Sequence, residues 1–247
     1  MMPNKPRDFI AGSYYHIYNR GVEKRTIFLN QSFYYHFLKT IDFFRFYNKR
    51  KLSEGIPNKP TLPSSDKSIE LVKILCFVLM PNHYHLVLQQ TINGGISRFM
   101  NDIANSYTRY FNLKTKRLGH LFQGAFKAKT VESPESFLQV TRYIHLNPME
   151  FYSNSLQSAA SVKAQWLISY PYSSYKVYLG KSIIYDPCDH RLISEIVNSP
   201  KQYQEFVEAK IEERPGLGIA NLILEDEFPT PLLSPIIKGT ASDTSKV

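Results

Sequence analysis

Residues 73–88 read Lys-Ile-Leu-Cys-Phe-Val-Leu-Met-Pro-Asn-His-Tyr-His-Leu-Val-Leu. Residues 73–80 are too few for a typical helix and apolar enough for a strand buried in the middle of a sheet. Pro81 and Asn82 favour a turn, and residues 83–88 then resume as a second strand. The stretch therefore predicts a β-hairpin with a tight connection.

Hydrophobic periodicity predicts further elements on both sides of this hairpin. Aromatic residues and two-residue alternation indicate strands over 13–20 and 125–131. Apolar residues at spacings of three and four indicate helices over 31–47, 96–111 and 133–146.

The last of these helices has clear boundary signals. Ser133 is a suitable cap, and Pro134 fits the first helical turn. Asn147 and Pro148 are expected to stop the helix, because the residue before a proline is pushed away from helical geometry.

The element order is strand, helix, strand, strand, helix, strand, helix. It predicts an α+β fold with a ferredoxin-like, split-βαβ antiparallel sheet and one added C-terminal helix. We assign residues 8–150 to the main domain, with an exposed, disordered loop over about 50–68. Residues 151–212 form a C-terminal extension that looks loop-like over 170–175 and helical over 200–211, and residues 213–247 are expected to be a disordered tail.

Composition restricts the function classes. The hydrophobic fraction of 43%, with 17 Tyr and 16 Phe, excludes a mainly disordered chain. Thirty Lys and Arg against 21 Asp and Glu give a net charge of +9, which favours a polyanionic partner such as nucleic acid. Cys76 lies in an apolar run, far from Cys188, and is expected to be a buried free thiol. Because no apolar run approaches the length of a membrane span, we expect no membrane association and a cytoplasmic location.

Two small constellations could carry chemistry. His83 and His85 are two apart on a strand, so both imidazoles face one side of the sheet and could form half of a metal site. Tyr143 and Asn147 are four apart on a helix, so they share a face at the edge of the apolar stripe, looking into a cleft between helix and sheet. Each pair taken alone also fits a purely structural interpretation. His83 and His85 could be ordinary surface or core histidines, Tyr143 a packing residue and Asn147 a helix cap.

Together these residues resemble a known family. Met80-Pro81-Asn82-His83-Tyr84-His85-Leu86-Val87-Leu88 is similar to the histidine-hydrophobic-histidine motif of single-tyrosine HUH transposases, particularly the REP-associated tyrosine transposases. Three further segments agree with that family in the same order, and the resemblance covers roughly residues 10–180: Tyr15-His16-Ile17-Tyr18-Asn19-Arg20-Gly21, Tyr143-Ile144-His145-Leu146-Asn147-Pro148 and Tyr172-Ser173-Ser174-Tyr175.

The resemblance implies an enzyme that nicks and rejoins single-stranded DNA, with hairpin or palindromic repeats as its substrate. It implies that Tyr143 is the nucleophile, leaving a 5′-phosphotyrosine and a free 3′-OH, and that His83, His85 and Asn147 hold Mg²⁺ or Mn²⁺. A divalent cation suits this chemistry, since a tyrosine hydroxyl with an ordinary pKa of about 10 is a weak nucleophile at neutral pH. Both a homodimer and a monomer fit the resemblance.

Basic residues are the candidate DNA contacts, although any single one is more often a solvated charge. The candidates are Arg20, Arg98, Arg109, Lys114, Lys116, Arg117, Lys127 and Lys129. His16 and His145 are not assigned to the metal site; His145 is two helical positions from Tyr143 and should point away from it.

Two other classes of protein remain as alternatives. An RNA-binding module of the RRM type has a similar sheet but exposes aromatic residues on its central strands, where this chain has His83 and His85. Relaxases of the wider HUH class tend to place their tyrosine before the histidine motif, and replication initiators often have a lysine three residues after it. Here Tyr143 follows the motif, and Leu146 stands at that lysine position.

Overall fold

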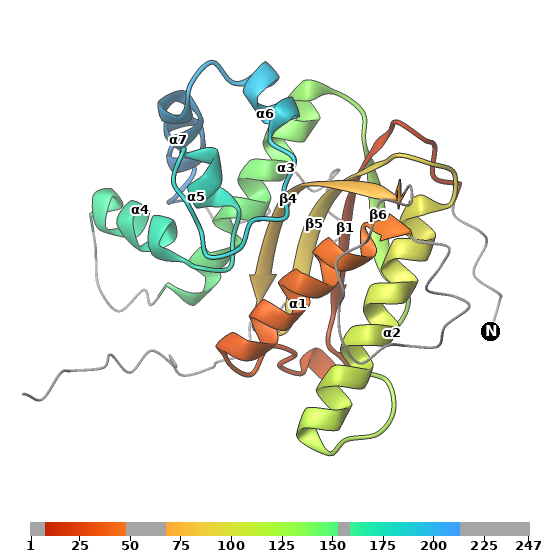
Figure 1. The fold of residues 1–247 in the computed structure, drawn as a ribbon. Helices are drawn as coiled ribbons and strands as arrows, with labels where there is room; N and C mark the ends of the chain where they lie inside the picture. Colours follow the sequence, from red (N-terminus) through yellow and green to blue (C-terminus); the bar gives the residue numbers. More distant parts are fainter. Residues whose placement is uncertain (1–7, 48–67, 153–158, 213–247) are drawn as a thin grey trace, which may run out of the picture.

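A computed structural model describes residues 8–47, 68–152 and 159–212 (Figure 1). Its main sheet has four strands in the order β4-β5-β1-β6, and every neighbouring pair is antiparallel. The strands are β1 (Tyr14–Arg20), β4 (Val72–Met80), β5 (His83–Gln90) and β6 (Lys127–Val131). This is the strand order of a ferredoxin-like fold, so the predicted fold class is confirmed.

The predicted hairpin is formed by β4 and β5, which are joined by Pro81 and Asn82 and pair from Met80 opposite His83. Its residues alternate between two faces. Tyr84, Leu86 and Leu88 belong to one hydrophobic core, whereas Val87 belongs to a second core on the opposite face. A bulge near Ile74 keeps the pairing but shifts the register of the first residues of β4.

Helices α1 (Gln31–Phe44) and α2 (Gly95–Thr115) cover the face that carries Tyr84 (Figure 1). The Asn30 side chain caps α1 by accepting from the Ser32 N–H. Helix α1 was predicted to reach residue 47 but ends three residues earlier. Residues Phe46–Tyr47 form strand β2 instead, which pairs with β3 (Ile69–Glu70). A short 3₁₀ helix, η1 (Val22–Lys24), follows β1.

Helix α3 (Pro134–Leu146) covers the opposite face, and Ser133 caps it as predicted. The α-helix ends at Leu146, as predicted, but the predicted reason is wrong: Asn147 keeps right-handed helical angles (φ −48°, ψ −42°), and the chain continues as the 3₁₀ helix η3 (Asn147–Phe151). Pro148 is tolerated because it falls in the first turn of η3, where its missing N–H costs no hydrogen bond.

The C-terminal extension is more helical than the sequence indicated. It contains α4 (Ala160–Ser169), α5 (Tyr175–Tyr178), α6 (Arg191–Ile196) and α7 (Pro200–Glu208). Only α7 was predicted. These helices share a hydrophobic core with α3 and β4, and Figure 1 shows them gathered beside α3.

Segment Tyr172–Ser174, in the stretch predicted to be loop-like, runs along the outer edge of β4. The Leu79 N–H donates to the Tyr172 carbonyl at 2.9 Å, and Val78 and Ser173 form an isolated antiparallel bridge. The extension therefore protects an otherwise open sheet edge.

Cys76 is a buried free thiol, as predicted. None of the helices in the described part of the chain is long and apolar enough to cross a membrane. Apart from Ser68, the loop predicted over 50–68 lies outside the described residues, as does the predicted tail over 213–247.

Candidate active site

The two histidines of β5 lie on the face of the sheet that α3 covers. Strand alternation puts His83 and His85 on this face and Tyr84 on the other, as the sequence predicted. The imidazole centroids are 5.1 Å apart and nearly perpendicular. Both rings can therefore present a nitrogen to one small volume between them and α3.

Helix α3 brings the tyrosine and the amide to the same place. The Tyr143 ring lies 5.5 Å from the His85 ring, and Asn147 Oδ1 lies 3.5 Å from His83 Nε2. The four-residue spacing puts Tyr143 and Asn147 one turn apart on one side of the helix. All four residues predicted for the site thus come together, from β5, α3 and the first residue of η3, which continues α3 directly.

Hydrogen bonds orient two of these groups so that lone pairs face each other. Asn82 Oδ1 lies 2.7 Å from His83 Nδ1 and can only accept, so neutral His83 carries its proton on Nδ1 and keeps a lone pair on Nε2. Asn147 Nδ2 donates to the Tyr143 carbonyl at 2.9 Å, which turns Oδ1 toward His83. Two acceptors facing each other are an arrangement that a cation would stabilise.

His85 supplies a second candidate ligand. Its Nδ1 lies 2.9 Å from His16 Nε2 on β1, whereas its buried Nε2 has no hydrogen-bond partner among the described residues. When His85 donates from Nδ1 to His16, its Nε2 is left with the lone pair that a metal requires. His16 was not assigned to the site from the sequence, but its contact orients His85; the predicted ferredoxin-like order, which puts the first strand beside the second strand of the hairpin, was the signal that could have identified it.

The residues of this cluster fit a divalent cation only if the side-chain amide of Asn147 is one of the ligands. Within the described ranges, no group of three or more His, Cys, Asp or Glu side chains could hold a metal ion. A site would therefore combine His83 and His85 with Asn147. The 3.5 Å between His83 Nε2 and Asn147 Oδ1 is close to the separation of two ligands on one ion, about 3 Å for bonds of about 2.1 Å at a right angle.

The cluster is shielded from solvent. The exposed fractions are 6% for His83, 0% for His85, 2% for Tyr143 and 1% for Asn147. Burial lowers the pKa of His83 to about 4 and takes the pKa of His85 well below its usual range, so both imidazoles are neutral at pH 7. Neutral imidazole is the form that binds a metal.

His145 does not belong to this cluster, as expected from its position on the helix. It points into the C-terminal extension, where Tyr203 Oη lies 2.7 Å from Nδ1 and Ser174 Oγ lies 2.8 Å from Nε2. Burial lowers its pKa to about 3.

These buried histidines predict a loss of stability in acid. Unfolded imidazoles titrate near pH 6.5, whereas burial lowers the pKa of His83, His85 and His145 in the folded protein. Between pH 6.5 and about 4 the unfolded state therefore binds more protons. The free energy of unfolding should fall as pH falls, by up to about 1.4 kcal/mol per pH unit for each histidine.

Urea titrations in EDTA at pH 7.5, 6.5, 5.5 and 4.5 measure this dependence. Replacing the exposed His120 with glutamine should leave the slope unchanged. An unfolding free energy that stays constant between pH 6.5 and 5 would contradict the assignment of neutral buried imidazoles.

The candidate DNA-binding residues lie in three places. Arg98 lies away from the site: its guanidinium lies over the Tyr47 ring at 4.1 Å and pairs with Asp102 at 3.7 Å. Arg20 lies next to the site, opposite His83 in the strand register, and its guanidinium helps to lower the pKa of His83. The other six lie on α2, on the loop that follows it and on β6: Arg109, Lys114, Lys116, Arg117, Lys127 and Lys129.

The loop after α2 approaches the same end of the sheet. Gln123 N donates to the Arg20 carbonyl at 2.9 Å, and Arg20 Nε donates to the Gln123 side chain. Arg117 donates to the His120 carbonyl at 2.7 Å and so shapes this loop. Lys127 lies over the Tyr18 ring, on the face that carries the cluster.

Fold and site together define the class: a basic, ferredoxin-like α+β protein whose central strand presents two histidines to a tyrosine on an added helix. The sequence model of the family described as "Transposase IS200 like" matches residues 31–147, which include all four residues of the cluster. This segment is similar to the IS200-like transposase family, in agreement with the resemblance found in the sequence motifs.

Among solved structures, the chain is similar to a REP-associated tyrosine transposase bound to a REP hairpin. The two are 14% identical, the match covers 77% of this chain and 96% of that one, and the TM-score is 0.45. No curated protein sequence matches the chain.

Proposed function

We propose that this transposase-family protein cleaves and rejoins single-stranded DNA through a 5′-phosphotyrosine on Tyr143, with a divalent cation held by His83, His85 and Asn147. The observation that carries the proposal is the convergence of these four side chains from β5, from α3 and from the start of η3. The resemblance to REP-associated transposases is the reason to propose hairpin or palindromic repeats as the substrate.

The covalent step needs no external energy source. The Tyr143 oxygen attacks a phosphodiester phosphorus, the bond from phosphorus to the 3′ oxygen breaks, and the phenolic proton leaves for solvent or for the 3′ oxygen, giving a free 3′-OH. Because the phosphotyrosine is itself an ester, the 3′-OH of another strand can displace Tyr143 and restore a phosphodiester.

A bound cation would withdraw charge from the phosphate and stabilise the leaving oxygen. Two imidazole nitrogens and one amide oxygen suit Mn²⁺ better than Mg²⁺, which prefers oxygen ligands. The chain's own residues do the positioning: Asn82 and His16 orient the two imidazoles, and the Tyr143 carbonyl orients Asn147.

The proposed reaction requires the buried Tyr143 side chain to become accessible to DNA. Since Tyr143 is only 2% exposed, a scissile phosphate can reach its hydroxyl only after the side chain or the end of α3 moves. The hydroxyl has no hydrogen-bond partner among the described residues, so no bond has to break when it turns toward DNA. We propose that DNA entry is coupled to this displacement.

A covalent-capture assay tests the function. A pool of single-stranded hairpin oligonucleotides with randomised flanks and a labelled 3′ end is incubated with the protein and Mn²⁺, then denatured in SDS. We expect labelled protein in Mn²⁺ and none in EDTA, because the fragment that carries the 3′ label is the one joined to tyrosine. DNA that binds in Mn²⁺ without any covalent label would favour a non-enzymatic binding module.

The loop after α2 is proposed as part of the DNA-binding surface. Lys116 ends α2 with left-handed angles (φ 53°, ψ 39°), a position where glycine is usually favoured. The strained lysine is exposed beside Lys114. A contact of its side chain with a DNA phosphate would explain why a lysine occupies this site.

Lys116→Gly should therefore weaken DNA binding without lowering the stability of the protein. The melting temperature should stay equal or rise, because glycine relieves about 1 kcal/mol of backbone strain. The slope of log K against log salt for single-stranded DNA should fall by about 0.7 for one lost phosphate contact. Lys201→Ala on α7, whose side chain is also exposed, is the control and should leave the slope unchanged. An unaltered slope in Lys116→Gly would remove this residue from the proposed surface.

A further inference from the structure

The side of α3 that faces away from the histidine pair is held by a buried hydrogen-bonded chain. His145 lies on this side, between Tyr143 and Asn147 in sequence, and is fully buried. Its two ring nitrogens bond in opposite directions, to Tyr203 of α7 at 2.7 Å and to Ser174 at 2.8 Å. An imidazole held at both nitrogens cannot turn without breaking one of these bonds.

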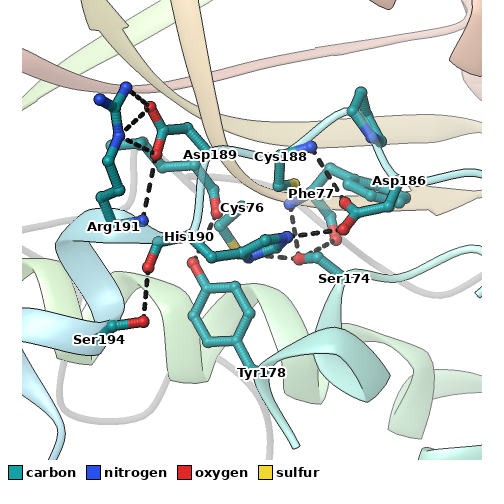
Figure 2. Close-up of polar contacts among 12 residues, drawn as sticks. Cys76, Phe77, Ser174, Tyr178, Asp186, Cys188, Asp189, His190, Arg191 and Ser194 are labelled. Atoms are coloured by element: carbon teal, nitrogen blue, oxygen red, sulfur yellow. Dashed lines mark hydrogen bonds and ion pairs between the residues drawn. The ribbon is translucent and has the colours of Figure 1, made fainter. Parts of the chain in front are cut away.

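Ser174 connects His145 to the sheet. Its hydroxyl accepts from the Phe77 N–H at 3.0 Å, and its own N–H donates to the Phe77 carbonyl at 3.0 Å. Figure 2 shows Ser174 beside Phe77 and Cys76 of β4. Strand β4 pairs directly with β5, where Val78 lies opposite His85. The chain Phe77–Ser174–His145 therefore links the strand next to the histidine pair with the helix that carries Tyr143.

The rotation of α3 about its axis decides whether the cluster forms. A tyrosine hydroxyl lies roughly 8 Å from the helix axis, so a rotation of about 20° would move it by about 3 Å. A misplacement of about 1 Å in a reacting group can cost about 100-fold in rate. The apolar contacts of α3 with the sheet are non-directional and tolerate such a rotation more readily than the two bonds of His145 do.

We infer that Ser174 and Tyr203 are positioning residues that act through His145 to set the rotation of α3 and bring Tyr143 and Asn147 to the histidine pair. The inference deepens the proposed function and rests on it for its catalytic consequence. It also gives a role to the Tyr172–Tyr175 segment, which no part of the covalent chemistry uses.

The test compares two variants with two matched controls. Ser174→Ala and Tyr203→Phe each remove one hydroxyl that bonds to His145. Ser173→Ala removes a similarly buried hydroxyl that accepts from the Tyr175 N–H within its own turn and makes no hydrogen bond to His145 among the described residues. Tyr178→Phe removes a buried hydroxyl that donates to the Leu75 carbonyl at 2.6 Å, although its ring packs 4.7 Å from His145.

We expect Ser174→Ala and Tyr203→Phe to lower kcat for adduct formation about 10-fold with KM for DNA unchanged. Both controls should stay within about twofold of wild type, although all four variants lose some thermal stability. A rate loss that follows the melting temperature across the four variants, or wild-type kcat in Ser174→Ala, would overturn the inference.

A second readout does not depend on activity. In protein labelled with 3-fluorotyrosine, the ¹⁹F resonance of Tyr143 is assigned by its absence in Tyr143→Phe. It should shift in Ser174→Ala and Tyr203→Phe and stay in place in Ser173→Ala. If wild-type protein forms no adduct with DNA, the proposed function fails, while this shift still decides whether the chain positions α3.

Discussion

Tyr143→Phe is expected to abolish the covalent adduct, with a loss of cleavage on the order of 10³-fold or more, since removal of a nucleophile takes away the covalent route itself. The folded protein should tolerate the change. The Tyr143 hydroxyl is buried without a hydrogen-bond partner in the described part of the chain, so its removal costs no bond and can raise the melting temperature. The measurement is the 3′-label assay in Mn²⁺, with thermal unfolding of the same preparations.

Tyr18→Phe is the matched control for this experiment. The Tyr18 ring is 5.5 Å from the His85 ring, the same separation as that of Tyr143, but it stacks nearly parallel to the imidazole rather than edge-on. Its adduct yield should remain close to that of wild type. An adduct that persists in Tyr143→Phe and disappears in Tyr18→Phe would reassign the nucleophile to β1, and peptide mapping of the DNA-linked protein would identify it directly.

His85→Ala is expected to produce the second large effect. Removing the imidazole deletes one proposed ligand and also the partner of His16. Changes to residues that only support a ligand typically cost 10–100-fold in metal affinity or activity. Loss of the ligand should therefore weaken Mn²⁺ binding, measured by calorimetry without DNA, by about 100-fold or more, with a comparable loss of adduct at fixed Mn²⁺.

The cavity left by His85→Ala allows chemical rescue. Free imidazole matches the missing ring in size and ligand chemistry, so its addition should restore part of the Mn²⁺-dependent adduct. His36→Gln is the control, because His36 stacks on Tyr110 of α2, on the opposite face of the sheet. Wild-type Mn²⁺ affinity in His85→Ala would exclude this histidine from the metal site.

The placement of His83 and His85 was predictable because it depends on local geometry. A strand puts alternate residues on opposite faces whatever surrounds it, and the Pro81-Asn82 turn is a local feature of the chain. The pairing of Tyr143 with Asn147 follows in the same way from the pitch of a helix. The ferredoxin-like strand order was also predictable, since the order of strands and helices along the chain permits few topologies.

The surroundings of these residues were harder to predict from the sequence. His16 contacts His85 because β1 lies next to β5, so the bond joins residues 69 positions apart. The sequence placed Tyr143 at the edge of an apolar stripe beside a cleft, whereas the structure buries it. Helix α4 was missed because its polar and apolar residues show little helical segregation, and its place depends on packing against the rest of the extension.

The sequence alone determined the local patterns: a hairpin with two histidines on one face, a capped helix with a tyrosine and an amide one turn apart, and a family resemblance based on those motifs. Only the tertiary structure decided that β5 and α3 meet, that His16 and Asn82 orient the imidazoles, and that His145 bonds to Tyr203 and Ser174 of the extension. The reason is physical. Periodicity is a property of neighbouring residues, whereas the rotation of a helix against a sheet is set by contacts between segments far apart in the chain.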